Sequence, residues 1–488
     1  MRLGKENIIK IEKTRALLRV YINLAKILET RGVNTFFTIM KQLCKVTEKF
    51  FQTAFSKILL VVLVVSFGAN AQISVPDSNF AAAIRSACPD CIDNTNKLLA
   101  PAASMKGLDV SGKGIKSLEG IQGFTSLETL LCASNSLTTL PPLPNTLVAL
   151  YCDINNLTSL PTLPPSLSMM SCKFNKLTSL PTLPNSLSQL AINYNEVASL
   201  PALPTTMLYL DATRNKLTSI ASLPDSLRYF ACAGNLLTSL PVLPSKLSYF
   251  NCSANKITQL PALPSGITAL YSADNLLTSL PALPANLTQI LNCSTNQLTA
   301  LPTLPSGLKQ IECSFNLLVA LPALPGSLSS LVAEGNQLTG LPTLPSTLTI
   351  MYLKNNQLKS LPALPATLYF LNLQNNLLNC LPELTNSSMF LYIDADRIGC
   401  LPNIPANISV FNANNVLIPT PPVCQSTINQ STGAVAAGTY FAKERIESAG
   451  TIATTGKTNY FANQSITLKP GFVSSNGTTF LVEVKTCN

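Results

Sequence analysis

Cysteine is the residue type in this sequence whose chemistry is most open, because histidine is absent from all 488 residues. Without histidine there is no Ser-His-Asp or Cys-His relay, and the usual zinc sites lose their commonest ligand. The 14 cysteines can instead form disulfides or pack as small apolar side chains. We therefore expect no catalytic residue, no metal site and no cofactor, and the sequence does not predict an enzyme.

Seven of the cysteines occupy one position of a sequence repeat. Other repeats carry Ile192, Ala212, Leu353 or Leu373 at this position, so it is apolar. A cysteine there behaves as a small hydrophobic side chain. We expect buried free thiols at Cys132, Cys152, Cys172, Cys232, Cys252, Cys293 and Cys313.

Six of the remaining cysteines suggest disulfides. Cys88 and Cys91 form the sequence C-P-D-C ahead of the repeats, and no thioredoxin-like βαβ pattern surrounds them, so we expect a structural disulfide rather than a redox site. Cys380 and Cys400 fall at equivalent places in consecutive repeats, where a spacing of ~5 Å permits a bridge. Cys424 and Cys487 bracket the C-terminal segment. For the last two pairs, disulfide and free thiol remain open alternatives.

Tyrosines recur at the polar positions beside a buried strand residue. Tyrosine offers a rigid contact area with a polar tip and is enriched in recognition surfaces. The alternative is that these aromatic residues only favour strand structure and cover one another. The candidate ligand-binding residues are Tyr209, Tyr229, Tyr249, Tyr271, Arg228, Arg214 and Asp211, with a second cluster around Tyr352 and Phe370.

These residues belong to a repeat of 20 residues, with one single-residue insertion between positions 275 and 296. Each unit reads L-x-x-L-x-[C/L/I]-x-x-N-x-L followed by L-P-x-L-P. The asparagine marks every unit, and Asp396 takes its place in the next one. The column of structural asparagines is Asn135, Asn155, Asn175, Asn195, Asn215, Asn235, Asn255, Asn275, Asn296, Asn316, Asn336, Asn356 and Asn376.

The residue types of the repeat predict one coil per unit. The stretch L-x-x-L-x-[C/L/I] alternates apolar and polar residues, which indicates a short strand with one buried face. The following asparagine offers a carbonyl and an amide to backbone groups that lose strand partners where the chain turns. The two prolines of L-P-x-L-P cannot donate to a ladder, so we expect extended backbone there. The leucines of that segment should point into the core.

The repeat resembles the leucine-rich repeat, in the short L-P-x-L-P subtype of bacterial proteins. The resemblance covers residues 127–418 and implies an α/β-type repeat solenoid that is mostly β, right-handed and curved, with a parallel sheet on its concave face and extended convex segments. It also implies binding of a protein or glycan on the concave face. Residues 72–126 resemble the N-terminal caps of such proteins, which cover the first coil. Cys91-Ile-Asp93 matches the C-x-D motif of ubiquitin-ligase effectors, but it lies in the wrong place, and we interpret it as chance.

The first 71 residues have the features of a secretory leader. A ten-residue apolar run, Ile58 to Phe67, follows several lysines and precedes Ala69-Asn70-Ala71. This order predicts a signal peptide cleaved before Gln72, and the run is short for a membrane span. An uncleaved anchor is the alternative, and Met40 is a second candidate start. We expect a secreted or cell-surface protein without a stable transmembrane span.

Residues 424–488 differ in composition from the repeats. Leucine becomes rare, glycine, serine and threonine increase, and short strand patterns such as Tyr440-Phe-Ala442 and Tyr460-Phe-Ala462 alternate with turn residues. This predicts a small all-β module. Together with the final cysteine, the sequence Ile466-Thr-Leu-Lys-Pro-Gly-Phe472 resembles the small C-terminal β-stack domain of Bacteroidetes-type secreted proteins, called the three-coathanger stack. That resemblance implies attachment rather than activity.

The charge distribution argues against a nucleic-acid partner. The net charge is +10, but residues 1–71 hold 12 of the 33 basic and 4 of the 23 acidic residues, which leaves the rest at +2. A near-neutral body lacks the basic stripe that nucleic-acid binding needs. The sequence therefore favours a non-catalytic binding protein, with a structural surface spacer as the alternative. The pattern leaves the oligomeric state open.

Overall fold

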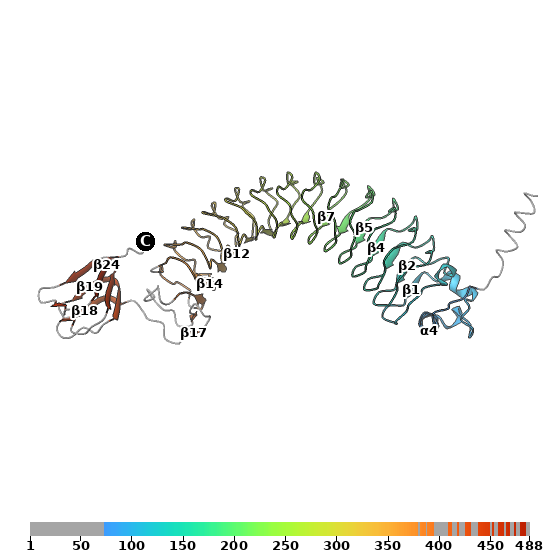
Figure 1. Cartoon of the computed structure of the whole chain (residues 1–488), viewed down its shortest axis with the longest axis horizontal. Helices are drawn as coiled ribbons and strands as arrows, with labels where there is room; N and C mark the ends of the chain where they lie inside the picture. Colours follow the sequence, from blue (N-terminus) through green and yellow to red (C-terminus); the bar gives the residue numbers. More distant parts are fainter. Residues whose placement is uncertain are drawn as a thin grey trace, which may run out of the picture. The chain divides into compact units, whose positions relative to one another are not determined.

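The computed structural model describes residues 73–378, 381–386, 388–394 and 408–411, and beyond them the backbone of strands between 417 and 484 (Figure 1). Residues 1–72 lie outside the described part, so the leader, its cleavage site and Met40 remain sequence predictions. Among the residues that the structure describes, no helix combines the length and the apolar character that a membrane span needs.

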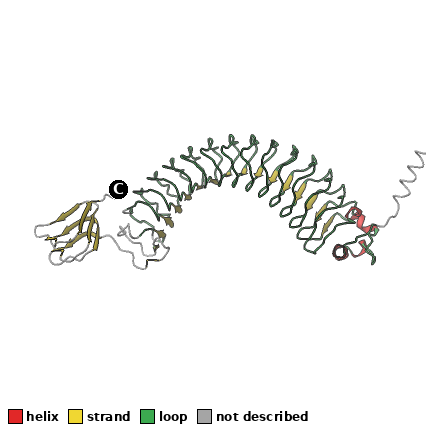
Figure 2. Ribbon diagram, in the orientation of Figure 1, coloured by secondary structure: helices red, strands yellow, loops and turns green. Residues whose placement is uncertain are grey.

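A short helical cap precedes the coils (Figure 2). It contains helix α4 (Ser78–Ala87) and the 3-10 turns Pro89–Cys91, Ala100–Ser104 and, further on, Ile121–Gly123. Asp77 caps α4: one carboxylate oxygen accepts hydrogen bonds from the N–H groups of Asn79 and Phe80, each at 2.9 Å. The other oxygen accepts from the N–H groups of Lys116 and Ser117, at 2.8 and 3.0 Å. One carboxylate thus joins the cap helix to the first coils.

Sixteen short strands stack in chain order, each paired in parallel with the next, and a seventeenth pairs antiparallel with the last. The repeat array curves, and the strands lie along its inner side (Figure 1). This confirms the predicted solenoid with a parallel concave sheet. The strands are β1 (Gly107–Asp109), β2 (Thr129–Leu131), β3 (Ala149–Tyr151), β4 (Met169–Ser171), β5 (Gln189–Ala191), β6 (Tyr209–Asp211), β7 (Tyr229–Ala231), β8 (Tyr249–Asn251), β9 (Ala269–Tyr271), β10 (Ile290–Asn292), β11 (Gln310–Glu312), β12 (Ser330–Val332), β13 (Ile350–Tyr352), β14 (Phe370–Asn372), β15 (Phe390–Tyr392), β16 (Ser409–Phe411) and β17 (Leu417–Ile418).

The register follows the sequence period. Residues 20 apart pair directly, as Tyr209 with Tyr229, so equivalent side chains form columns along the array. The single-residue insertion lies between Leu287 and Leu291. It does not disturb β10, because Ile290 still pairs with Ala269 and Leu291 with Leu270. The columns therefore continue without a shift through the longer coil.

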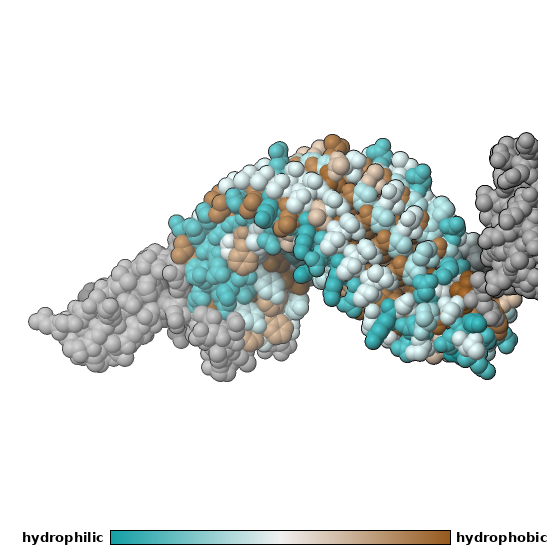
Figure 3. Space-filling view, turned by 45° about the vertical axis from the view of Figure 1, so that its right-hand side comes forward, coloured by the Kyte–Doolittle hydropathy of each residue, from teal (hydrophilic) through white to brown (hydrophobic). Residues whose placement is uncertain are grey.

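The core is a continuous column of leucines under the sheet. The middle residue of each strand from β1 to β16 is almost completely buried, as are most leucines of the L-P-x-L-P segments. Those segments contain neither helix nor strand and return the chain between strands, which agrees with the expected extended path. Figure 3 shows polar and apolar residues recurring from coil to coil on the surface.

A left-handed residue ends each strand segment. The residue directly before the column asparagine has a φ between +51° and +65° in each coil from Ser134 to Asn375. Glycine fills the position at Gly234 and Gly335, but most coils hold a side chain there, including Ile154, which is branched at Cβ. This backbone region is disfavoured for residues with a Cβ, by about 1–2 kcal/mol each. Contacts between coils must offset that cost.

Short strands make up the described elements of the C-terminal segment. They are β18 (Gln425–Gln430), β19 (Gly438–Ser448), β20 (Thr451–Ile452), β21 (Lys457–Ala462), β22 (Ser465–Leu468), β23 (Val473–Ser474) and β24 (Thr479–Val484). All their pairings are parallel. The segment is thus rich in strands, as expected, while the boundary at 424 and the likeness to a three-coathanger stack remain predictions.

Candidate functional site

The strands β6, β7 and β8 bring three tyrosines into one column on the inner face of the array. We call Tyr209, Tyr229 and Tyr249 the tyrosine ladder. The residues that directly follow them in the strands, Leu210, Phe230 and Phe250, are fully buried. Because successive side chains of a strand point to opposite faces, the tyrosines point outward. The neighbouring ladder rings stack with centroids 4.3 Å apart, and their planes are inclined by 14° for the first pair and 4° for the second.

Stacking determines which part of each tyrosine a ligand can reach. The faces of Tyr229 are covered by its two neighbours, so its edge and hydroxyl remain accessible. Burial raises the pKa of Tyr229, and the neighbouring tyrosines and Asp211 raise it further. Burial, followed by Asp211, also raises the pKa of Tyr209. The hydroxyls of Tyr209 and Tyr229 are therefore neutral at physiological pH and can donate and accept hydrogen bonds.

Two of the other predicted residues border the ladder. Tyr271 lies one column over on β9, and its ring centroid is 5.5 Å from that of Tyr249, with the rings tilted by 40°. Asp211 ends β6 in the same column as Tyr271, and its carboxylate accepts a hydrogen bond from the N–H of Thr213 at 3.0 Å. Arg228 is exposed and precedes β7. Tyr271 and Asp211 thus share the column next to the ladder, and Arg228 directly precedes Tyr229 in the chain.

The sequence argument grouped Arg214 with the ladder, and the structure places it in the turn after β6. It follows the end of β6 as one of the left-handed residues, and its guanidinium carbon is 5.2 Å from the ring centroid of Tyr194. Its side chain contacts Tyr194 instead of the ladder. The reason is the turn after the strand, which aims this position away from the strand columns.

The second predicted cluster lies on the last coils. The rings of Tyr352 and Phe370 are 4.5 Å apart, and Phe370 is 5.3 Å from Tyr392. Tyr392 stacks in turn on Phe411 at 4.5 Å. Four aromatic side chains from β13 to β16 thus form a continuous row, of which the sequence argument had named Tyr352 and Phe370 as candidate binding residues.

The asparagine column binds each coil to its neighbours. Asn215 accepts a hydrogen bond from the N–H of Val197 in the previous coil at 3.0 Å. Its amide donates to the carbonyls of Ile192 and Ala212, at 3.0 and 3.1 Å. The same pattern recurs from Asn135 to Asn376. The column is therefore structural, and both ends of each amide have partners.

The cysteine positions separate into two classes. All seven repeat cysteines are buried free thiols. Burial raises the pKa of Cys313 to about 12, and burial together with the charge of Asp153 raises that of Cys132 to about 12. Such thiols are poor nucleophiles at neutral pH. Cys88 and Cys91 form the predicted disulfide. Cys380, Cys400, Cys424 and Cys487 lie outside the described residues, so their pairing remains a prediction.

The side chains that sequence reasoning missed are Phe174 and Tyr194. They occupy the left-handed position after β4 and β5, where their rings stack at 4.2 Å with an angle of 15°. Their 20-residue spacing, which continues to Arg214, was visible in the sequence. The left-handed backbone that exposes them was not. Within the described residues, no group of three histidine, cysteine, aspartate or glutamate side chains could hold a metal ion.

The repeat array is similar to solved structures of known proteins. YopM, a leucine-rich effector protein from Yersinia pestis, is 33% identical with a TM-score of 0.57, over 62% of this chain and 88% of that chain. The functional domain of InlJ from Listeria monocytogenes, which includes a cysteine ladder, is 24% identical with a TM-score of 0.59, over 76% of this chain and 84% of that chain. The likeness to InlJ concerns the fold alone. No family model and no curated protein matches the chain.

Proposed function

Because the chain belongs to the leucine-rich-repeat family, we propose that it is a non-catalytic, secreted or cell-surface protein that binds a protein or glycan ligand on its concave face. The tyrosine ladder is the centre of the proposed site. Tyr271, Asp211 and Arg228 supply its margin. Proteins with this fold are typically interaction scaffolds, and repeat solenoids use extended concave surfaces for binding.

The observation that carries this proposal is the in-register stacking of Tyr209, Tyr229 and Tyr249. The three rings hold one another in place, so little side-chain entropy is lost when a partner binds. Their hydroxyls form a row of donors and acceptors above the buried Leu210, Phe230 and Phe250. Rigid aromatic side chains with polar tips are typical of recognition surfaces.

A binding experiment tests the ladder. We would apply the labelled full chain to intact cells and extracellular matrix of candidate tissues and microbes, and compare it with Tyr229→Ala and with Val242→Ser. Val242 is 84% exposed on a return segment and provides the control. We expect Tyr229→Ala to weaken binding at least tenfold while Val242→Ser binds normally. Equal binding by all three proteins would place the ligand elsewhere.

The export part of the proposal rests on the leader pattern in residues 1–71 and agrees with the disulfide between Cys88 and Cys91, since disulfides persist in oxidising compartments. Mass spectrometry of the native N-terminus after cell fractionation tests it. We expect Gln72 as the first residue, in the envelope or the medium. An intact Met1 or Met40 terminus in the cytosol would contradict export.

The alternative is a structural spacer attached through residues 424–488. The observation that favours it is the regularity of the coils, which repeat with little variation outside the aromatic columns. Deletion of residues 424–488 discriminates the two functions. For a spacer, the deletion abolishes surface retention and Tyr229→Ala changes nothing. For a binding protein, Tyr229→Ala abolishes recognition of the partner.

A further inference from the structure

A second surface lies past the ends of the strands, apart from the strand column of the tyrosine ladder. Phe174, Tyr194 and Arg214 follow β4, β5 and β6 and form what we call the strand-end ridge. The two aromatic rings stack, and the Arg214 guanidinium lies over Tyr194. Phe174 is 48% and Tyr194 40% exposed. Three consecutive coils thus present large side chains to solvent on one edge of the array.

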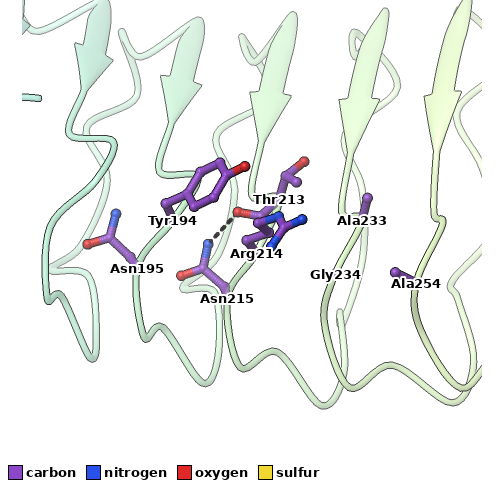
Figure 4. A pocket seen from close by; sticks show the side chains of 8 residues that line it. All are labelled: Tyr194, Asn195, Thr213, Arg214, Asn215, Ala233, Gly234 and Ala254. Carbon is purple, nitrogen blue, oxygen red and sulfur yellow. Dashed lines mark hydrogen bonds between the residues drawn. The ribbon is translucent and has the colours of Figure 1, made fainter. Parts of the chain in front are cut away.

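The ridge borders a hollow of about 610 Å³. Figure 4 shows the Arg214 side chain beside the short residues of the next coils, which leave the space open. A Cβ on Gly234 would lie 3.0 Å from Cγ of Arg214, so the glycine gives this arginine room to lie across the coil. The hollow is lined by Tyr194, Asn195, Thr213, Arg214, Asn215, Ala233, Gly234 and Ala254.

The hollow lies in a basic strip. From coil to coil between Cys172 and Lys256, this edge carries five basic side chains and Glu196, and the carboxylate of Asp211 accepts a hydrogen bond from the N–H of Thr213 beside the hollow. Glu196 is paired with Lys216 at 2.8 Å. Within the described part of the chain, Arg214 forms no ion pair and no side-chain hydrogen bond. The basic residues are Lys173, Lys176, Arg214, Lys216 and Lys256.

Asp274 limits the strip at its far end. It occupies the left-handed position one coil beyond Ala254 and is exposed. The Arg214 guanidinium therefore attracts an anion in the hollow, and the Asp274 carboxylate repels it. The favoured place for a negative charge is close to the guanidinium, which can bind a carboxylate through two parallel hydrogen bonds.

The backbone of the hollow has no free edge for a peptide strand. The N–H groups of Gly234 and Ala254 donate to the carbonyls of Ser253 and Ala273 in the following coils, both at 2.8 Å. The N–H of Arg214 donates to Ala233 at 2.7 Å. A ligand must therefore bind through the side chains: a guanidinium, lysine ammonium groups, the Thr213 hydroxyl and the small apolar floor. This favours a polyhydroxylated anion over an extended peptide.

The backbone of the ridge has the conformation of the repeat. Phe174, Tyr194 and Arg214 have φ values of 51°, 59° and 53°, where glycine would be free of strain. The same positive φ recurs in each coil from Ser134 to Asn375, so it belongs to the repeat and is not special to this site. Here the strained backbone aims the three side chains outward along one edge.

We propose that the hollow and its basic strip bind a carboxylated polysaccharide of the uronic acid type. One sugar ring lies over Gly234 and Ala254, and its carboxylate pairs with Arg214. Carboxylates further along the chain meet Lys256 on one side and Lys176 on the other. This site is independent of the ligand on the concave face.

Binding of polygalacturonate to the full chain at low salt tests the proposal, with dextran as the neutral control. Charge-assisted hydrogen bonds to a carboxylate are strong, so we expect Arg214→Gln to weaken binding about tenfold or more. Lys246→Gln removes an exposed charge outside the strip and should change nothing. Asp274→Asn should strengthen binding. Tyr229→Ala should leave it unchanged, which separates this site from the ladder.

Three results would overturn the proposal. The first is no measurable binding of polygalacturonate by the folded chain. The second is equal binding of poly-L-glutamate or dextran sulfate, which would show a general attraction of polyanions without selection of a carboxylated sugar. The third is an equal effect of Arg214→Gln and Lys246→Gln. Arg214 and Lys246 are both exposed, so we expect both variants to fold. Circular dichroism of each variant would show whether a loss of binding is caused by unfolding.

Discussion

At the scale of the residue, each column asparagine joins two coils through backbone hydrogen bonds that no aliphatic side chain can replace. In Asn215→Leu, the N–H of Val197 would lose its partner inside the solenoid, and the carbonyls of Ile192 and Ala212 would each keep one donor, Asn195 and Asn235 respectively. We expect the free energy of unfolding to fall by about 1–3 kcal/mol. Urea denaturation measures this. Asn145→Ala is the control, because Asn145 is exposed, and it should change stability little.

The buried thiols predict a loss of stability at alkaline pH. An unfolded cysteine ionises near its ordinary pKa of about 9, while burial holds the pKa of folded Cys313 at about 12. The folded state therefore disfavours the thiolate. Stability is fully present below pH 9 and falls as the pH rises from about 9 towards 12.

Denaturation between pH 8 and 11 measures this effect, and Cys313→Ala provides the comparison. The variant loses some packing at every pH, but its stability should decline less steeply with pH than that of the parent chain. The same slope in both proteins would mean that Cys313 does not contribute. In the folded protein at pH 7, thiol reagents should leave the seven repeat cysteines unmodified, as peptide mapping would show.

At the scale of the element, Asp77 couples the cap helix to the coils. Burial tends to raise the pKa of Asp77, but the N–H groups of Phe80, Lys116, Ser117 and Asn79 together lower it. The cap is therefore stabilised above the ordinary pKa of the carboxyl and loses that contribution as the pH falls through the folded pKa. Asp77→Ala should cost about 0.5–2 kcal/mol.

Hydrogen exchange locates that effect. Amides of α4 should exchange faster in Asp77→Ala, whereas amides of β8 should keep the rate of the parent chain. Asp90→Ala is the control, since Asp90 is exposed in the following turn and caps no helix. Faster exchange throughout the array would mean that the cap holds all coils together rather than its own neighbours.

The repeat made the elements of the solenoid predictable, while local turn geometry was not. A strict alternation around Leu210 or Phe230 allows one strand register, and the asparagine spacing fixes the coil length. The same pattern cannot show that the residue before each asparagine has a positive φ, since the chain places Ile154 and Phe174 there as well as Gly234. The contact of Arg214 with Tyr194 at this turn was therefore not foreseen. Helix α4 was also missed, because the cap has no repeat.

At the scale of the whole repeat array, each coil contacts only the coils beside it. Stability in such an array is a sum of neighbouring contributions, and a damaged coil opens locally. In Asn215→Leu, exchange should increase in β5, β6 and β7 and remain slow in β3 and β11. The array can thus tolerate variation on one surface without altering another. That property would allow the tyrosine ladder and the strand-end ridge to serve separate ligands.

The stacked tyrosines also have an optical consequence. The chain contains no tryptophan and 12 tyrosines, three of which hold their rings 4.3 Å apart in nearly parallel planes. Chromophores in such an arrangement couple their electronic transitions and give a circular dichroism signal that isolated tyrosines lack. A ligand that separates or tilts these rings would change that signal. The concave face therefore contains an intrinsic spectroscopic probe, with which binding can be followed without any label.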